Sequence, residues 1–156
     1  MPIHFLKEQA AQHNHDMRTG MADGSPNRLK DYGLRLSVIA GLVGNTGQDA
    51  RNLLGGAFAI VLSSANMLRL DLGKELALNP VSDGRAFFIR FADAAGDYAD
   101  AGEKIDHLED FRGIACDATR RLAAAVRDRA NELGVDLAKA VHDYRECQLS
   151  SLAMAA

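Results

Sequence analysis

The stretch from Leu53 to Leu72 is the most apolar part of this chain, and it restricts the fold more than any other feature. Its apolar residues recur at helical spacing and form a stripe too wide for a helix that packs on one side only. The polar residues that interrupt it are Ser63, Ser64, Asn66 and Arg69. We therefore predict a buried helix with several neighbours and not a membrane span.

Apolar residues at helical spacing continue through nearly all of the remaining sequence. Aromatic residues are only 6% of the chain and Trp is absent, which disfavours a β-sandwich or barrel. The hydrophobic fraction of 47% is too high for a disordered chain. We predict an all-α fold, a helical bundle of about five to six helices in a single domain spanning residues 1–156.

Clusters of helix-breaking residues divide the predicted bundle. Ser25 and Pro26 suit the start of a helix, and the Gly-Asn-Thr-Gly turn at 44–47 is expected to end it. Thr46 or Asp49 can start the apolar helix that follows. The clearest break is the Asn-Pro-Val-Ser-Asp-Gly cluster at 79–84, which separates two halves, 1–79 and 84–149.

The two ends of the chain are also expected to be helical. Residues 3–16 suit a short helix that places Phe5, Leu6, Gln9 and Ala10 on one side. The last helix follows Asp136 and is expected to bury Leu137, Ala140, Val141 and Tyr144. From residue 150 onward the tail is expected to fray.

Residues 67–76 resemble residues 132–141 at an offset of 65. The aligned pairs are Leu68 with Leu133, Asp71 with Asp136, Leu72 with Leu137 and Lys74 with Lys139. In each block an Asp is placed to cap a short helix after a long apolar one. A duplication would make the two halves a pseudo-dimer within one chain, and chance recurrence of a common helix-turn-helix pattern is the alternative.

Three acidic residues, Asp93, Asp97 and Asp100, follow one another at positions i, i+4 and i+7. On an α-helix this spacing places their carboxylates on one face, where like charges repel by a few tenths of a kcal/mol per pair. A divalent cation such as Mg²⁺ would offset that repulsion because it prefers carboxylate oxygens. A solvated acidic face, screened by salt, is the alternative.

The segment Asp-Ala-Ala-Gly-Asp-Tyr-Ala-Asp-Ala at 93–101 resembles a motif of the MazG-like all-α nucleoside triphosphate pyrophosphohydrolases. That family carries Glu-Glu-x-Gly-Glu-Leu-Ala-Glu-Ala at this place, so Asp replaces Glu here. Asp117 follows in a helix that runs into Leu-Gly-Val-Asp-Leu at 133–137, a turn of the kind that follows the second motif of the family. The resemblance covers roughly residues 87–145, with a fainter echo over 28–78.

The resemblance implies an enzyme that cleaves a nucleoside triphosphate between its α and β phosphates. Its cofactor would be Mg²⁺, with Mn²⁺ as the alternative, because metal ions at such a site neutralise developing charge. The implied metal ligands are Asp93, Asp97, Asp100 and Asp117, and the implied catalytic residues are Asp93, Asp97 and Asp117. Arg120 stands where the family has a metal-binding acid and would contact phosphate instead.

The departures from the family favour a second hypothesis, a non-catalytic helical protein that binds a protein partner or a nucleotide. Arg120 replaces an acid, and residues 34–42 of the first half carry no carboxylate. A simple salt-bridge arginine is the alternative role for Arg120. Under either hypothesis the wide apolar stripes lead us to expect a homo-oligomer.

Charge and cysteine content limit the location and the partners. The net charge of −3 gives no strong signal for nucleic acid, and no membrane partner is expected. Two cysteines do not make a disulfide scaffold. The first eight residues lack the basic and apolar pattern of a secretory signal, so we expect a cytoplasmic protein with reduced thiols.

Overall fold

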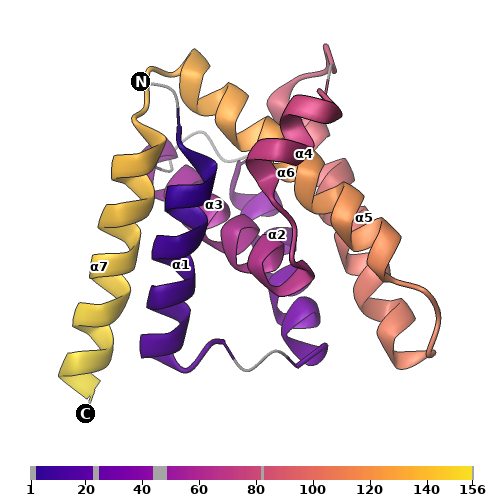
Figure 1. The fold of residues 1–156 in the computed structure, drawn as a ribbon. Helices are drawn as coiled ribbons and strands as arrows, with labels where there is room; N and C mark the ends of the chain where they lie inside the picture. The colour runs from indigo at the N-terminus through magenta and orange to yellow at the C-terminus, as the bar shows by residue number, and fades with distance from the viewer. Residues whose placement is uncertain (1–2, 23–24, 44–48, 82, 156) are drawn as a thin grey trace.

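The computed structural model describes residues 3–22, 25–43, 49–81 and 83–155 (Figure 1). These residues form helices and no strand, which confirms the predicted all-α helical bundle. The helices are α1 (Phe5–Thr19), α2 (Asn27–Val43), α3 (Ala50–Leu68), α4 (Leu72–Leu78), α5 (Phe87–Asp106), α6 (Arg112–Glu132) and α7 (Leu137–Ala155). Seven described helices exceed the expected five to six because Asp71 caps a separate short helix, α4.

Some predicted helix ends agree with the structure and others differ. Asp49 caps α3, its side chain accepting a hydrogen bond from the Arg51 amide at 3.0 Å. The predicted turn at 44–47, and with it Thr46 as a helix start, lies outside the described residues. The tail predicted to fray from residue 150 instead continues α7 to Ala155.

Helix α3 occupies the centre of the bundle, as its wide apolar stripe predicts. Every residue from Leu54 to Ala65 is buried, and α1, α2, α6 and α7 all pack against this helix. Phe58 and Leu62 have no exposed surface, and full burial of a side chain of this kind stabilises a fold by about 1.5–3 kcal/mol. In Figure 1, α1 and α7 lie side by side at one edge of the bundle, and α5 lies at the opposite edge.

The approach of α7 to α3 depends on glycine. A Cβ atom built on Gly55 would lie 2.5 Å from the carbonyl oxygen of Ala140, closer than real Cβ contacts allow. Gly56, one residue on, would meet the ring of Tyr144 at 3.1 Å. The predicted inward face of α7 is confirmed: Leu137, Ala140 and Val141 are buried and Tyr144 is partly buried.

A buried hydrogen-bonded junction joins the centre of the bundle to α5 and α6. The Ser64 hydroxyl lies 2.7 Å from the Tyr98 hydroxyl and 2.9 Å from the Thr119 hydroxyl. Thr119 also donates to the Ala115 carbonyl at 2.7 Å. Because buried hydroxyls are costly when unpaired, this junction fixes the relative positions of three helices.

The predicted side of α1 is buried only in part. Gln9 is buried and Phe5 packs against the core, whereas Leu6 and Ala10 are exposed. Polar residues of the same helix, Glu8, Gln12 and Asp16, are buried against the bundle. The reason is a cation from α7: Arg145 donates to Glu8 at 3.2 Å and to Gln12 at 2.9 Å. We call Glu8, Gln12, Asp16, Ser63 and Arg145 the buried polar cluster.

The two blocks at an offset of 65 have the same backbone conformation. Arg69 and Gly134 both adopt a left-handed conformation, with φ of 55° and 65°. Asp71 and Asp136 then accept hydrogen bonds from the amides of Lys74 at 3.0 Å and of Lys139 at 3.1 Å. In both turns an amide donates at 2.8 Å to the carbonyl five residues back, Leu70 to Ala65 and Val135 to Ala130. These bonds are those of a helix C-cap followed by an N-cap.

None of the described helices has the length and apolar character to cross a membrane alone. Helices α3 and α4 are long and apolar enough only when taken together, and the chain bends by 91° between them.

The close packing at Gly55 gives a first prediction. Gly55→Ala is expected to destabilise the protein by about 1–3 kcal/mol because the added methyl group overpacks α3 against α7. Gly96→Ala is the matched control, since a Cβ there meets nothing within 4 Å. The control should instead stabilise α5 by about 0.5–1 kcal/mol. Urea unfolding measures both, and a neutral Gly55→Ala would contradict the packing.

Candidate functional site

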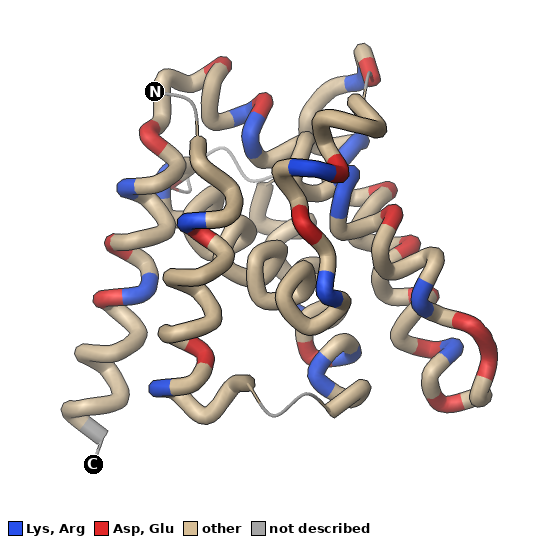
Figure 2. The backbone as a smooth tube through the Cα atoms, in the orientation of Figure 1, with Lys and Arg blue, Asp and Glu red and all other residues tan. Residues whose placement is uncertain are grey.

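The acidic face of α5 is held outward by the packing of its opposite face. Phe91, Ala95 and Tyr98 are buried, which leaves Asp93 and Asp97 at the surface, each with about half of its side chain exposed. Figure 2 shows acidic and basic positions interleaved along α5 and α6. The i, i+4 spacing therefore produces the shared acidic face that the sequence predicts.

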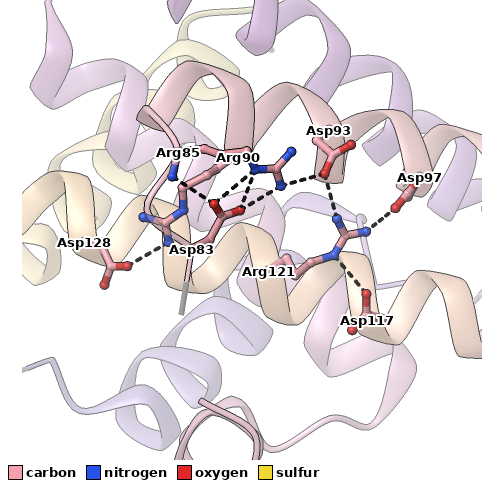
Figure 3. A network of polar contacts seen from close by, with 8 residues as sticks. All are labelled: Asp83, Arg85, Arg90, Asp93, Asp97, Asp117, Arg121 and Asp128. Carbon is pink, nitrogen blue, oxygen red and sulfur yellow. Dashed lines mark hydrogen bonds and ion pairs between the residues drawn. The ribbon is translucent and has the colours of Figure 1, made fainter. Parts of the chain in front are cut away.

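Helix α6 faces these carboxylates with one acid and one arginine. Leu122 and Ala118 are fully buried and set the rotation of α6 against α5. Asp117 and Arg121, at i and i+4, then point toward α5, as Figure 3 shows. The structure thus brings three of the predicted site residues together: Asp93, Asp97 and Asp117.

The centre of this group is a guanidinium. Arg121 donates through Nε to Asp117 at 2.9 Å, through Nη1 to Asp93 at 3.3 Å and through Nη2 to Asp97 (Figure 3). We call these four residues the Arg121 cluster. An arginine thus reduces the repulsion between neighbouring carboxylates that the spacing predicts, and it matches carboxylates well because its planar donors are fixed.

The cluster continues as a chain of ion pairs on both sides. Arg85 donates to Asp93 at 3.0 Å and forms a two-pronged contact with Asp83, with Nη2 at 2.7 Å. Arg120 donates to Asp117 and to the carbonyl of Asn79 at 2.9 Å. Arg120 therefore holds the segment after α4 against α6, and its guanidinium already contacts two protein groups.

The remaining predicted ligand, Asp100, lies outside the cluster. Its ion-pair partner is Lys104, one turn further along α5, at 3.9 Å. A separate pair joins the same two helices beyond Asp93, where Arg90 donates to Asp128 at 2.8 Å. The seam between α5 and α6 is thus lined with alternating charges.

Neighbouring arginines lower the pKa values of two of these acids, Asp117 and Asp83. Burial by itself would raise the pKa of Asp117, but hydrogen bonds from Arg120 and the charge of Arg121 hold it below its ordinary value. Hydrogen bonds from the Arg85 side chain and backbone lower the pKa of Asp83 to about 2. Both carboxylates are therefore ionised at neutral pH.

This donor set does not fit a divalent cation as it is arranged. The three carboxylates converge on Arg121, and a cation at the same point would be repelled by the guanidinium. Within the described ranges, no group of three or more His, Cys, Asp or Glu side chains is placed to hold a metal ion. The positive charge among these carboxylates is supplied by Arg121.

Two features of this arrangement were missed at the level of sequence. Arg121 belongs to an arginine-rich stretch and has no spacing that separates it from Arg120. Arg145, the cation of the buried polar cluster, stands alone near the end of the chain. The sequence did contain an indication of a role for Arg145. The first helix carries many polar residues, and they need a polar or charged partner if that helix is to pack against the bundle.

Comparison with protein-family models, with curated proteins and with solved structures gave no match to this chain.

The central position of Arg121 gives a second prediction. Arg121→Gln is expected to destabilise the protein by about 1–2 kcal/mol, because three carboxylates lose their shared charged donor. The matched control is Arg51→Gln, which removes one exposed pair, with Asp143 at 2.6 Å between α3 and α7. The control should cost below about 1 kcal/mol. Equal losses in chemical denaturation would contradict a special role for Arg121.

The pKa of Asp83 gives a third prediction. Its folded value of about 2 lies below the ordinary 3.8, so the ionised carboxylate stabilises the fold fully above 3.8, and this contribution is lost as the pH falls through 2. Asp83→Asn should therefore lower the melting temperature slightly near neutral pH, and the difference from the wild type should shrink as the pH is lowered from 3.8 through 2. A difference that persists unchanged across this range would show that Asp83 acts by another route.

Proposed function

We propose that this chain is a non-catalytic helical binding protein, in which the Arg121 cluster is a structural ion-pair network. The observation that carries the proposal is that Asp93, Asp97 and Asp117 all contact one guanidinium. These contacts use the side chains that a MazG-like site would need for its metal. Arg120, the expected phosphate contact, is likewise committed to Asp117 and Asn79.

The binding part of the proposal is supported by hollows elsewhere on the surface. One, of about 480 Å³, is lined by Arg35 of α2 and by Tyr144, Cys147 and Leu152 of α7. Another, of about 420 Å³, shares Tyr144 and Cys147 with it. Volumes of this order are those of sites for small molecules or for side chains of a partner.

We also propose that the two halves form the expected pseudo-dimer. In this relation α2 corresponds to α5, α3 to α6 and α4 to α7. The contact of α2 with α3 then has its equivalent in α5 with α6, and the contact of α3 with α7 has its equivalent in α6 with α4. The corresponding helices α2 and α5 contact each other, as do α3 and α6. Such self-paired contacts are typical of two-fold symmetry, and the matching turns at Arg69 and Gly134 support the same relation.

Nucleoside triphosphate pyrophosphohydrolase activity is the competing proposal. The observation that favours it is the convergence of Asp93, Asp97 and Asp117 from two helices onto one point. This proposal requires Arg121 to leave that point before any substrate or cofactor enters. Its side chain lies at the surface of the seam, about one-quarter exposed.

One experiment separates the two proposals, and it is our fourth prediction. The protein is melted with Mg²⁺ or Mn²⁺, with and without a panel of nucleoside triphosphates, and pyrophosphate release is assayed in parallel. We expect no metal-dependent shift in the melting temperature and no pyrophosphate, because the carboxylates are already neutralised. Pyrophosphate release by the wild type would overturn the non-catalytic proposal.

Variants make this test sharper. Arg121→Gln removes the shared donor of the three carboxylates, leaving Asp97 without its arginine while Asp93 keeps Arg85 and Asp117 keeps Arg120. We expect this variant to gain stabilisation by divalent cations that the wild type lacks. Arg51→Gln, whose exposed pair lies between α3 and α7, should show no such gain. A gain in both variants would mean that the cations bind elsewhere.

A further inference from the structure

A polar pocket lies between α1, α2 and the end of α3, and none of its residues belongs to the Arg121 cluster. Its volume is about 280 Å³. Its lining consists of His13, Asp16, Met21, Ala22, Tyr32, Ser63, Asn66, Met67 and Arg69. We call it the polar pocket, since most of these residues carry a polar side chain.

The inner side of the polar pocket is a buried carboxylate held by neutral donors. Asp16 is 5% exposed and accepts hydrogen bonds from the Ser63 hydroxyl at 2.7 Å and from the Gln12 amide at 2.8 Å. Tyr32, also buried, lines the same pocket. Burial, and then the charge of Asp16, raise the pKa of Tyr32 to about 12, so its hydroxyl is protonated at neutral pH.

The charges in the buried polar cluster do not balance. Glu8 and Arg145 form a pair at 3.2 Å, which leaves Asp16 without an arginine or lysine partner among the described residues. The nearest basic atom is Nδ1 of His15 at 3.4 Å, and Nε2 of the same ring is buried without a hydrogen-bond partner. A buried carboxylate that lacks a full counter-charge is costly, and a cationic group in the pocket would reduce this cost.

The outer side of the pocket carries the opposite charge. Arg69 caps α3 in a left-handed conformation and is exposed. Over the described ranges its guanidinium forms no ion pair, and His13 stands at the same opening. The pocket thus offers a buried carboxylate and an exposed guanidinium, and Met21 and Met67 also line it.

We propose that the polar pocket binds a small zwitterion of amino-acid size, with its ammonium group at Asp16 and its carboxylate at Arg69. A molecule of this class supplies a counter-charge for Asp16 and an anion for the Arg69 guanidinium, which forms no ion pair with another described residue. The methionines suit an apolar substituent because their side chains adapt to irregular shapes. The inference gives a ligand class to the proposed binding function and rests on it.

The fifth prediction tests this assignment by isothermal titration and thermal shift with the twenty free amino acids at millimolar concentration. Methylammonium and acetate serve as probes that carry only one of the two charges. We expect saturable binding of at least one amino acid and weaker binding of both single-charge probes. No binding by any amino acid, or equal binding by methylammonium, would overturn the proposal.

Variants locate the binding. Arg69→Gln removes the positive charge while leaving a non-glycine residue in the left-handed backbone conformation. It should weaken binding about tenfold or more, as expected for loss of one ion pair in a partly enclosed site. Asp16→Asn should abolish amino-acid binding. If Asp16→Asn does not fold, Ser63→Ala, which removes one hydrogen bond to Asp16, takes its place and should weaken binding. Arg18→Gln, an exposed arginine of α1 outside the pocket, is the control. Unchanged affinity in Arg69→Gln would overturn the assignment.

The failure of this inference is distinguishable from failure of the proposed function. Pyrophosphate release would refute the non-catalytic function whether or not an amino acid binds. Absence of amino-acid binding, with no pyrophosphate released, would refute the ligand class alone.

Discussion

Burial of α3 on all sides is the constraint on which the rest of this structure depends. A helix with twelve consecutive buried residues, Leu54 to Ala65, has to be covered all round. Its few polar groups then decide which neighbour goes where. Ser63 bonds to Asp16 of α1, and Ser64 bonds to Tyr98 of α5 and to Thr119 of α6. Each hydroxyl would be costly without its partner, so together they fix the register of the helices.

Local features of this fold were predictable because they depend on neighbours in the chain. An Asp before an amphipathic helix is an N-cap whether the helix that follows is short, as α4 after Asp71, or long, as α7 after Asp136. The shared face of Asp93 and Asp97 follows from helical geometry alone. The same reasoning does not say what faces them, because that depends on the rotation of α6 about its axis.

Arg120 and Arg121 illustrate this limit. They are adjacent in the sequence and lie about 100° apart around the helix, so a modest rotation decides which one enters the acidic group. The packing of Ala118 and Leu122 places Arg121 there. For α1 the limit is distance along the chain, since Arg145, which buries its polar face, lies 137 positions from Glu8. The spacing of apolar residues could not predict this face of α1, because it is buried by an ion pair and hydrogen bonds with Arg145 and not by apolar contacts.

The single connection between α4 and α5, from Asn79 to Ala86, has a thermodynamic consequence. Leaving α1 aside, it joins α2, α3 and α4 to α5, α6 and α7, and extensive contacts run between these two sets: α2 with α5, α3 with α7 and α3 with α6. A short tether of this kind gives the two sets an effective concentration of about the millimolar range. Their association is therefore independent of dilution, whereas two separate chains with the same contacts would come apart as the protein concentration falls.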